Sequence, residues 1–413
     1  MLVDFSVSNF GPFRDRVTLS MQATKFDEHP ENKVDTEQVK NGVLTSAAIF
    51  GANSSGKSYV FHAMQALQAM VAGMYESGFR YPWYQPFRLC SENADRPVCI
   101  SIRLLIDGIL HVYSISYTED RIVSESLDYY PLGRSRAVFD RSSGKGMKKS
   151  IRSNTSESTA YLTSAAKFND DLCSKVRNEI GSIAIVFPSE SNMIGYSASL
   201  IDSDPNLKKM MVDALGVADF GISGINCDAR EVNYEGMGKT LNQSTLELMK
   251  TRDKEMGNKA YELSLMHSFE KSDCSDLQKT FPMNIESEGT QQMFGIMGPV
   301  IDVLNRGNTI MIDGMGSRLH PLLTHWLVEL FKTDSNRNGA QLIFNTHDLT
   351  LLDVHDLFRR DQIYFTNKDR DYGCSELYSL SDFKGVRLES DLIKSYLSGR
   401  FDAVPKIISR EGI

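Results

Sequence analysis

The feature that most constrains the fold is residues 44–71, where an apolar run passes through a Gly/Ser-rich turn into an amphipathic segment. The sequence there is LTSAAIFGANSSGKSYVFHAMQALQAMV. A short apolar run that ends at a glycine turn is typical of a buried strand, and the apolar spacing after the turn is typical of a helix. The segment therefore predicts a strand, a loop and a helix in that order, as in a parallel α/β sheet.

The turn itself carries a motif with a known physical role. Residues 51–58, GANSSGKS, match G-x-x-x-x-G-K-[ST] between the strand and the helix that the motif requires. Backbone N–H groups of such a loop surround phosphate groups at the positive end of the helix. We expect Lys57 to contact phosphate oxygens and Ser58 to offer its hydroxyl to Mg²⁺, on a loop shaped by Gly51, Asn53, Ser54, Ser55 and Gly56. The sequence thus predicts a bound nucleoside triphosphate.

Strand and helix patterns recur on both sides of this motif. Alternating segments predict two short strands at the start and then an antiparallel meander, at residues 2–10, 17–21, 98–106, 110–118 and 121–130. Near the end, strands and helices alternate as in parallel βαβ units, at residues 290–304, 309–313, 320–331, 340–346 and 361–366. Between these parts lie two candidate helices, residues 205–215 and 245–266.

These patterns predict an α/β protein in which a phosphate-binding core is interrupted by an insertion. We expect residues 1–150 to form the first half of the core with the meander, and residues 281–413 to form the second half. Residues 151–280 are polar and favour helices, so we interpret them as an inserted, mainly helical arm or lid.

Two further elements of the second half bear on chemistry. In residues 308–321, NTIMIDGMGSRLHP, an apolar run leads into Asp313, as in the metal-binding strand of many nucleotide hydrolases. Upstream, residues 286–290, ESEGT, precede a helix and place a hydroxyl and a small residue at its N-terminus. That element is either a phosphate-contacting signature or only a capped helix start.

Several ordered motifs together resemble a known group of proteins. They are FSVSNFGPF, GANSSGKS, ESEGT, IMIDGMGSRLHPLL, NTHDLTLLD, RRDQIYFTNKD and ELYSLSDF, which cover both ends of the chain and leave the middle uncovered. The chain resembles ABC-type ATPases of the RecF and structural-maintenance-of-chromosomes kind. Within that group it is most similar to the AAA-labelled ATP/GTP phosphatases of bacterial abortive-infection, retron-linked and PARIS-type anti-phage systems.

The resemblance implies ATP, Mg²⁺ and a homodimer with two composite sites. In such ATPases the signature of one subunit closes on the γ-phosphate held by the other, a role that would fall to Ser287, Gly289 and Thr290. By the same resemblance Asp313 would be the Mg²⁺-side carboxylate, His347 the switch histidine near the γ-phosphate, and residues 317–320 the segment that crosses the dimer interface. Assembly beyond a dimer is left open.

One position departs from the group. Relatives usually carry Glu after the metal-side aspartate, where it positions the attacking water, but this chain has Gly314. Three explanations compete: a natural slow or inactive hydrolase, an introduced substitution, and a substitute base such as His347 or Glu288. Because the loss of a positioned base costs roughly 10²- to 10⁴-fold in rate, hydrolysis is expected to be weak.

The resemblance implies a sensor or scaffold that controls a separate effector, a nuclease or another toxin, in anti-phage defence. The alternative is a RecF-like ATPase that clamps DNA in repair or chromosome maintenance. A formal net charge of −8 gives no overall positive potential that would attract nucleic acid. The N-terminus lacks the features of a signal peptide and no apolar run is long enough for a membrane span, so we expect a cytoplasmic location.

Two further features give weaker signals for a binding function. Residues 133–153 carry seven Lys or Arg against one Asp, a pattern that either contacts nucleic-acid phosphates or forms a solvated hairpin, and the hairpin is favoured. Gln85 is a candidate for the glutamine that links Mg²⁺ to the arm in ABC-type ATPases.

Overall fold

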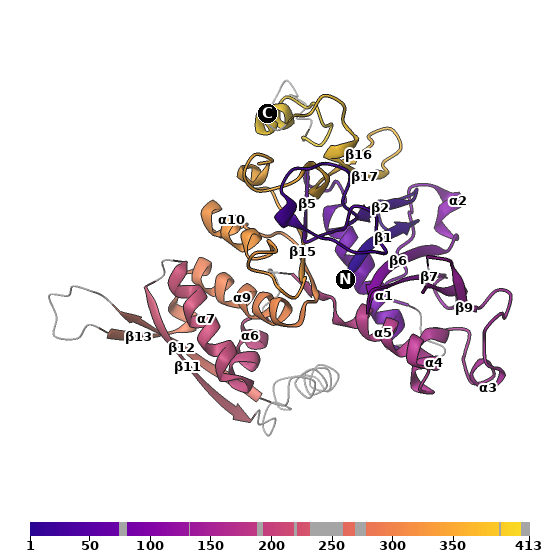
Figure 1. The fold of residues 1–413 in the computed structure, drawn as a ribbon, viewed down its shortest axis with the longest axis horizontal. Helices are drawn as coiled ribbons and strands as arrows, with labels where there is room; N and C mark the ends of the chain where they lie inside the picture. The colour runs from indigo at the N-terminus through magenta and orange to yellow at the C-terminus, as the bar shows by residue number, and fades with distance from the viewer. Residues whose placement is uncertain are drawn as a thin grey trace. The chain divides into compact units, whose positions relative to one another are not determined.

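The computed structural model describes residues 1–73, 81–131, 133–187, 193–218, 221–231, 259–268, 278–387 and 390–405. The chain divides into two compact units, and each is described by itself. The first unit comprises Met1–Ile185, Gly307–Ser317 and Thr324–Ile413, and the second comprises Val186–Arg306 and Arg318–Leu323. Figure 1 shows their elements coloured in chain order.

A six-stranded sheet forms the centre of the first unit. Its strands follow the order β10-β14-β15-β5-β16-β17, with the bounds Ala184–Val186, Thr309–Ile312, Gln341–Asn345, Ser46–Gly51, Ile363–Lys368 and Ser375–Ser379. Strand β5 pairs in parallel with both β15 and β16, which come from the far end of the chain. All residues of β5 are buried, as expected for a strand covered on both faces. The predicted α/β fold class is confirmed.

Helix α1, Lys57–Ala72, follows β5 directly through the glycine-rich turn, so the predicted strand, loop and helix are confirmed. The helix ends at Gly73, which has a φ of 73° and whose N–H donates to the carbonyls of Ala69 and Met70. Such a left-handed C-terminal glycine satisfies carbonyls that lack a partner in the last turn. Helix α10, Pro321–Glu329, matches the prediction for residues 320–331.

The second sheet of this unit is antiparallel throughout. Its order is β2-β1-β6-β7-β8-β9, with the bounds Val17–Ser20, Leu2–Ser8, Val98–Ile106, Ile109–Tyr117, Ile122–Tyr130 and Arg136–Asp140. The predicted meander is confirmed as β6, β7 and β8, and β1 joins it by pairing with β6. Edge strand β9 and the short helix α3, Lys149–Arg152, lie within the basic stretch of residues 133–153.

Short elements complete the first unit. Its remaining strands and helices are β3 (Lys33–Val34), β4 (Val43–Leu44), α2 (Ser91–Ala94), α4 (Tyr161–Lys167), α5 (Asp171–Ser182) and α11 (Leu392–Leu397). Single 3₁₀ turns are η1 (Pro30–Asn32), η4 (Leu349–Leu351), η5 (Arg360–Gln362) and η6 (Leu380–Asp382).

The second unit combines helices with a three-stranded antiparallel sheet. It contains α6 (Met193–Ser203), α7 (Pro205–Val217), β11 (Ile222–Glu231), β12 (Lys259–Ser268), β13 (Gln278–Pro282), η3 (Met283–Ile285) and α9 (Glu288–Arg306). Helices α6 and α9 approach closely, since a Cβ at Gly298 would lie 2.2 Å from the Ser197 hydroxyl. The predicted helices over residues 205–215 and 290–304 are confirmed.

One predicted element of this unit is wrong. We expected a helix over residues 245–266, but residues 259–266 belong to strand β12, and residues 245–258 lie outside the described part of the chain. The cause is pairing, because β12 has neighbours on both sides, β11 and β13. Among the described residues, no helix is both long and apolar enough to cross a membrane.

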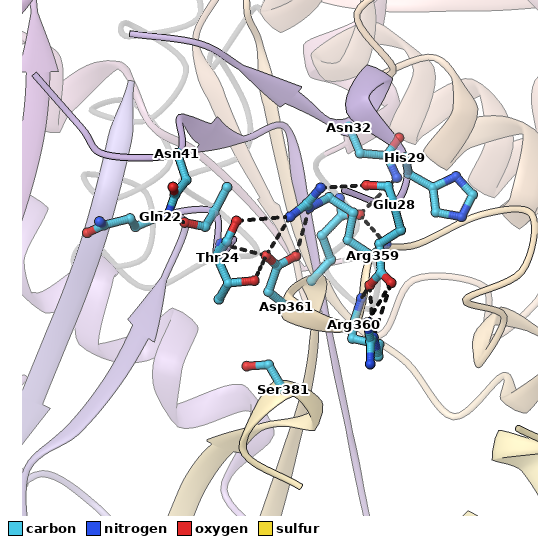
Figure 2. A network of polar contacts seen from close by, with 12 residues as sticks. Gln22, Thr24, Glu28, His29, Asn32, Asn41, Arg359, Arg360, Asp361 and Ser381 are labelled. Atoms are coloured by element: carbon cyan, nitrogen blue, oxygen red, sulfur yellow. Dashed lines mark hydrogen bonds and ion pairs between the residues drawn. The ribbon is translucent and has the colours of Figure 1, made fainter. Parts of the chain in front are cut away.

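A buried ion pair in the segment before β16 is hydrogen-bonded to the loop after β2 (Figure 2). The Arg359 guanidinium donates to both carboxylate oxygens of Asp361, at 2.9 and 3.0 Å, and both side chains are almost fully buried. The same carboxylate accepts the Thr24 N–H at 2.7 Å, while Arg359 also donates to the carbonyl of Glu28. Because every polar group here has a partner, the network can be accommodated inside the protein.

Candidate functional site

The phosphate loop between β5 and α1 depends on left-handed backbone. Ser54 has a φ of 62° and Gly56 a φ of 105°, and L-residues with side chains rarely adopt such angles. At Gly51, a Cβ would lie 2.4 Å from the Thr366 hydroxyl on neighbouring strand β16, so no larger residue fits. Ser55 is buried beneath the loop, and its hydroxyl is hydrogen-bonded to that of Thr366. Ser55 therefore supports the loop from below.

Lys57, the first residue of α1, reaches back over this loop. Its ammonium donates to the carbonyls of Gly51 at 2.8 Å and Ala52 at 2.9 Å. Burial lowers the pKa of Lys57 to about 8, and the nearby Asp313 carboxylate only partly offsets that effect. The Lys57 ammonium is buried and only partly compensated by negative charge from the protein, so it is suited to bind an anionic ligand.

Asp313 and Gly314 follow β14 at the carboxyl edge of the parallel sheet. The Asn345 side chain, at the end of neighbouring strand β15, donates to Asp313 Oδ1 and accepts the Gly314 N–H at 2.8 Å. Gly314 has a φ of 78°, and a Cβ built there would have no atom within 4 Å. The position thus has open space but a backbone that favours glycine.

His347 lies two residues beyond β15. Its side chain is exposed at the surface of the site. Partial desolvation of the ring by the surrounding protein lowers the pKa of His347 below its ordinary value, and the positive charge of Lys57 lowers it further. The imidazole is therefore predominantly neutral near pH 7, and one ring nitrogen can accept a hydrogen bond.

These groups share one cavity of about 950 Å³ within the first unit. Of the residues predicted from the sequence, it is lined by Asn53, Ser54, Gly56, Lys57, Ser58, Asp313 and His347, with Gly314 beside them. Among its described lining residues, the cations Lys57, Arg88 and Lys368 face a single carboxylate, Asp313. The cavity is large enough for a small organic ligand and its charge favours an anion.

One wall of the cavity consists of residues 82–89. The carbonyl of Gln85 accepts the Gly11 N–H at 2.6 Å, and the Asn9 side chain accepts the Phe87 N–H at 3.2 Å. These contacts bring the turn after β1 and the loop before β6 to the phosphate loop. Gln85, a weak candidate from sequence, lines the cavity, whereas Arg88, Lys368 and Asn345 were missed. Of these, only Asn345 gave a sequence signal, as a polar residue that ends an apolar strand.

The ESEGT element belongs to the second unit, whereas the residues that line the cavity belong to the first. Ser287 caps α9, with its hydroxyl accepting the Thr290 N–H at 3.1 Å, and the two hydroxyls are 2.8 Å apart. Gly289 approaches the carbonyl of Arg318, and the Arg318 guanidinium is 3.4 Å from the Glu288 carboxylate. Ser287 and Glu288 are exposed. The element is therefore a capped helix start whose first side chains remain accessible.

A known protein family matches the part of the chain that supplies the second half of this site. Residues 250–353 match the family described as "AAA domain, putative AbiEii toxin, Type IV TA system". That segment includes Asp313, Asn345 and His347, which share the cavity with the phosphate loop. Over that segment the chain is related to the AAA-type ATPases. The carboxylate edge of the cavity lies within the matched segment, and the phosphate loop lies outside it. No curated protein sequence matched the chain.

Solved structures give a distant likeness. The SMC head domain from Thermotoga maritima is 12% identical with a TM-score of 0.41, over 92% of this chain and 98% of that chain. An SmcHead bound to the C-winged helix domain of ScpA is 13% identical with a TM-score of 0.41, over 92% and 97%. An Smc head domain bound to the C-terminal domain of ScpA derived from Pyrococcus furiosus is 12% identical with a TM-score of 0.38, over 97% and 99%.

Proposed function

We propose that this protein binds Mg·ATP in the cavity of the first unit and hydrolyses it slowly. The observation that carries the proposal is that Lys57, Ser58 and Asp313 line one cavity together with Gly314. Gly314 stands where the ATPases that the sequence resembles usually carry a glutamate. The loop geometry fits a triphosphate, because side chains are excluded at Gly51 and, among the residues that the structure describes, the Lys57 ammonium donates only to the loop carbonyls of Gly51 and Ala52. Ser58 and Asp313 offer the oxygen ligands that Mg²⁺ prefers.

The roles of the individual residues follow from this placement. The loop N–H groups and Lys57 would bind the phosphates, Ser58 and Asp313 would hold Mg²⁺, and a neutral His347 would contact the γ-phosphate side. Gly314 leaves the attacking water without a carboxylate, so bound ATP would persist. The phosphate-loop contacts need no such base, and binding is therefore expected to be unimpaired.

We further propose that ATP drives a homodimer in which Ser287, Gly289 and Thr290 of each chain close the partner's site. The exposed Ser287 hydroxyl and the α9 N-terminus offer donors to a phosphate from another molecule. ATP would then act as a lasting lock on the assembly. The protein would then be a sensor or scaffold for a separate effector in anti-phage defence; the description of the matched family names a toxin–antitoxin system.

The test of the proposal is nucleotide-dependent association. With Mg·ATP, light scattering should show a dimer for the native protein and a monomer for Ser287→Arg, although ATP binding by the variant stays near native. Ser287→Arg places a bulky group where the partner's phosphate would lie. Asn284→Arg is the matched control, because Asn284 is also exposed and lies three residues earlier in the same segment. Equal dimer formation by native protein and Ser287→Arg would leave ESEGT as a helix cap only.

A further inference from the structure

Asn345 connects the two residues that set the chemistry of the carboxyl edge. Strands β14 and β15 are parallel neighbours with Ile312 opposite Phe344, so Asp313 and Asn345 leave the sheet side by side. The Asn345 side chain is only 3% exposed and both ends of its amide are used. The Gly314 N–H can only donate, which assigns Oδ1 to Gly314 and leaves the NH₂ group for Asp313.

The contact with Asp313 involves one carboxylate oxygen. Asn345 donates to Oδ1, while Oδ2 has no hydrogen-bond partner in the part of the chain that the structure describes. A donated hydrogen bond restricts rotation of the carboxylate and leaves the second oxygen to a cation in the cavity. Groups that orient a ligating carboxylate in this way contribute strongly to metal affinity, and their loss costs roughly 10- to 100-fold.

We propose that Asn345 is a positioning residue for metal-bound nucleotide. It holds the Asp313 carboxylate toward the cavity and also holds the Gly314 turn, so that Mg²⁺ strengthens the binding of ATP. This inference rests on the proposed function, since it requires the cavity to bind ATP. It predicts that Asn345 affects the gain in affinity that Mg²⁺ confers and leaves the metal-free contacts of the phosphate loop unchanged.

A purely structural role would look different. Thr346, the next residue, is also buried, and its hydroxyl donates to the carbonyl of Met315 in the same turn at 2.8 Å. Thr346→Val removes this hydrogen bond and the one that the hydroxyl accepts from the Asp348 N–H at 3.0 Å, without touching Asp313. It is therefore the matched control for Asn345→Leu, which removes both amide contacts with little change in side-chain volume.

The experiment measures ATP affinity by calorimetry for each full-length protein, once with Mg²⁺ and once with EDTA. For Asn345→Leu the ratio of the two affinities should fall by roughly 10- to 100-fold, with the EDTA affinity nearly native. Thr346→Val should keep the native ratio. Should Asn345→Leu not fold, Asn345→Ala carries the same test, with unfolding curves recorded for every variant.

Three results would overturn the inference. They are a native ratio in the Asn345 variant, an equal fall in Thr346→Val, and a fall confined to the EDTA affinity. Failure of the proposed function itself gives a separate signature, since native protein would then bind no ATP under either condition.

Discussion

Restoring a carboxylate at position 314 should accelerate hydrolysis and destabilise the fold. Gly314 lines the cavity and has no atom within 4 Å of an added Cβ, so the Glu side chain of Gly314→Glu has room to reach the ligand. The backbone is less permissive, because φ is 78°. A left-handed L-residue costs roughly 1–2 kcal/mol, and the reduced freedom of the unfolded chain returns roughly 0.4–1 kcal/mol. We expect a net loss of about 1 kcal/mol of unfolding free energy.

Although Gly314→Glu should lower stability, it should raise the rate of ATP hydrolysis. A positioned base contributes roughly 10²- to 10⁴-fold, and imperfect placement from a left-handed residue should still leave an increase of about tenfold or more. Single-turnover hydrolysis at equal ATP occupancy measures the rate, and urea unfolding measures stability. Two controls separate the effects: Gly314→Gln has the shape without the carboxylate, and Gly314→Asn tolerates the left-handed backbone.

Two outcomes of these controls would contradict the expected roles of the carboxylate and of the left-handed backbone. If Gly314→Gln accelerated hydrolysis as much as Gly314→Glu, the carboxylate would not be the missing group. If Gly314→Asn lost as much stability as Gly314→Glu, the left-handed backbone would not explain the cost. Rapid turnover by native protein would direct attention to His347 and Glu288 as the base.

Two other predictions follow from buried charges. Because the pKa of Lys57 is about 8, its ammonium is lost as pH rises through that value. Metal-free ATP affinity should therefore decline above pH 8 by up to about tenfold per pH unit, a decline that Lys57→Arg should lack in titration calorimetry. Asp361→Ala leaves the Arg359 guanidinium buried without its carboxylate, and urea denaturation should show a loss of about 3–5 kcal/mol. Asp356→Ala, at an exposed site, should show almost none.

Sequence patterns were sufficient where the local signal and the final environment agree. Residues 44–71 form the predicted strand, loop and helix, because an apolar run and a glycine-rich turn specify that structure locally. The meander and the later parallel strands also follow their patterns. In residues 259–266 the buried Leu263 and Leu265 alternate with Ser264, a strand signal that the helix-forming residues before them concealed.

The rest of the site depends on strand pairing and loop contacts that cannot be predicted from the linear sequence. Asn345 meets Asp313 only because β14 and β15 are neighbours in register, and the linear sequence gives no such pairing. Likewise, Gln85 reaches the cavity because Gly11 and Asn9 hold the loop of residues 82–89. The left-handed backbone at Gly314 is also invisible in sequence, where the glycine reads only as a missing carboxylate.

The proposed function depends above all on the binding of ATP through Lys57 and on its retention in the cavity. The most direct measurement mixes native protein with Mg²⁺ and γ-labelled ATP, separates bound from free nucleotide, and follows the bound label and its chemical form with time. We expect native protein to retain intact ATP for many minutes and Lys57→Ala to retain none. Absence of bound label in native protein, equal retention by Lys57→Ala, or prompt release of labelled phosphate would contradict it.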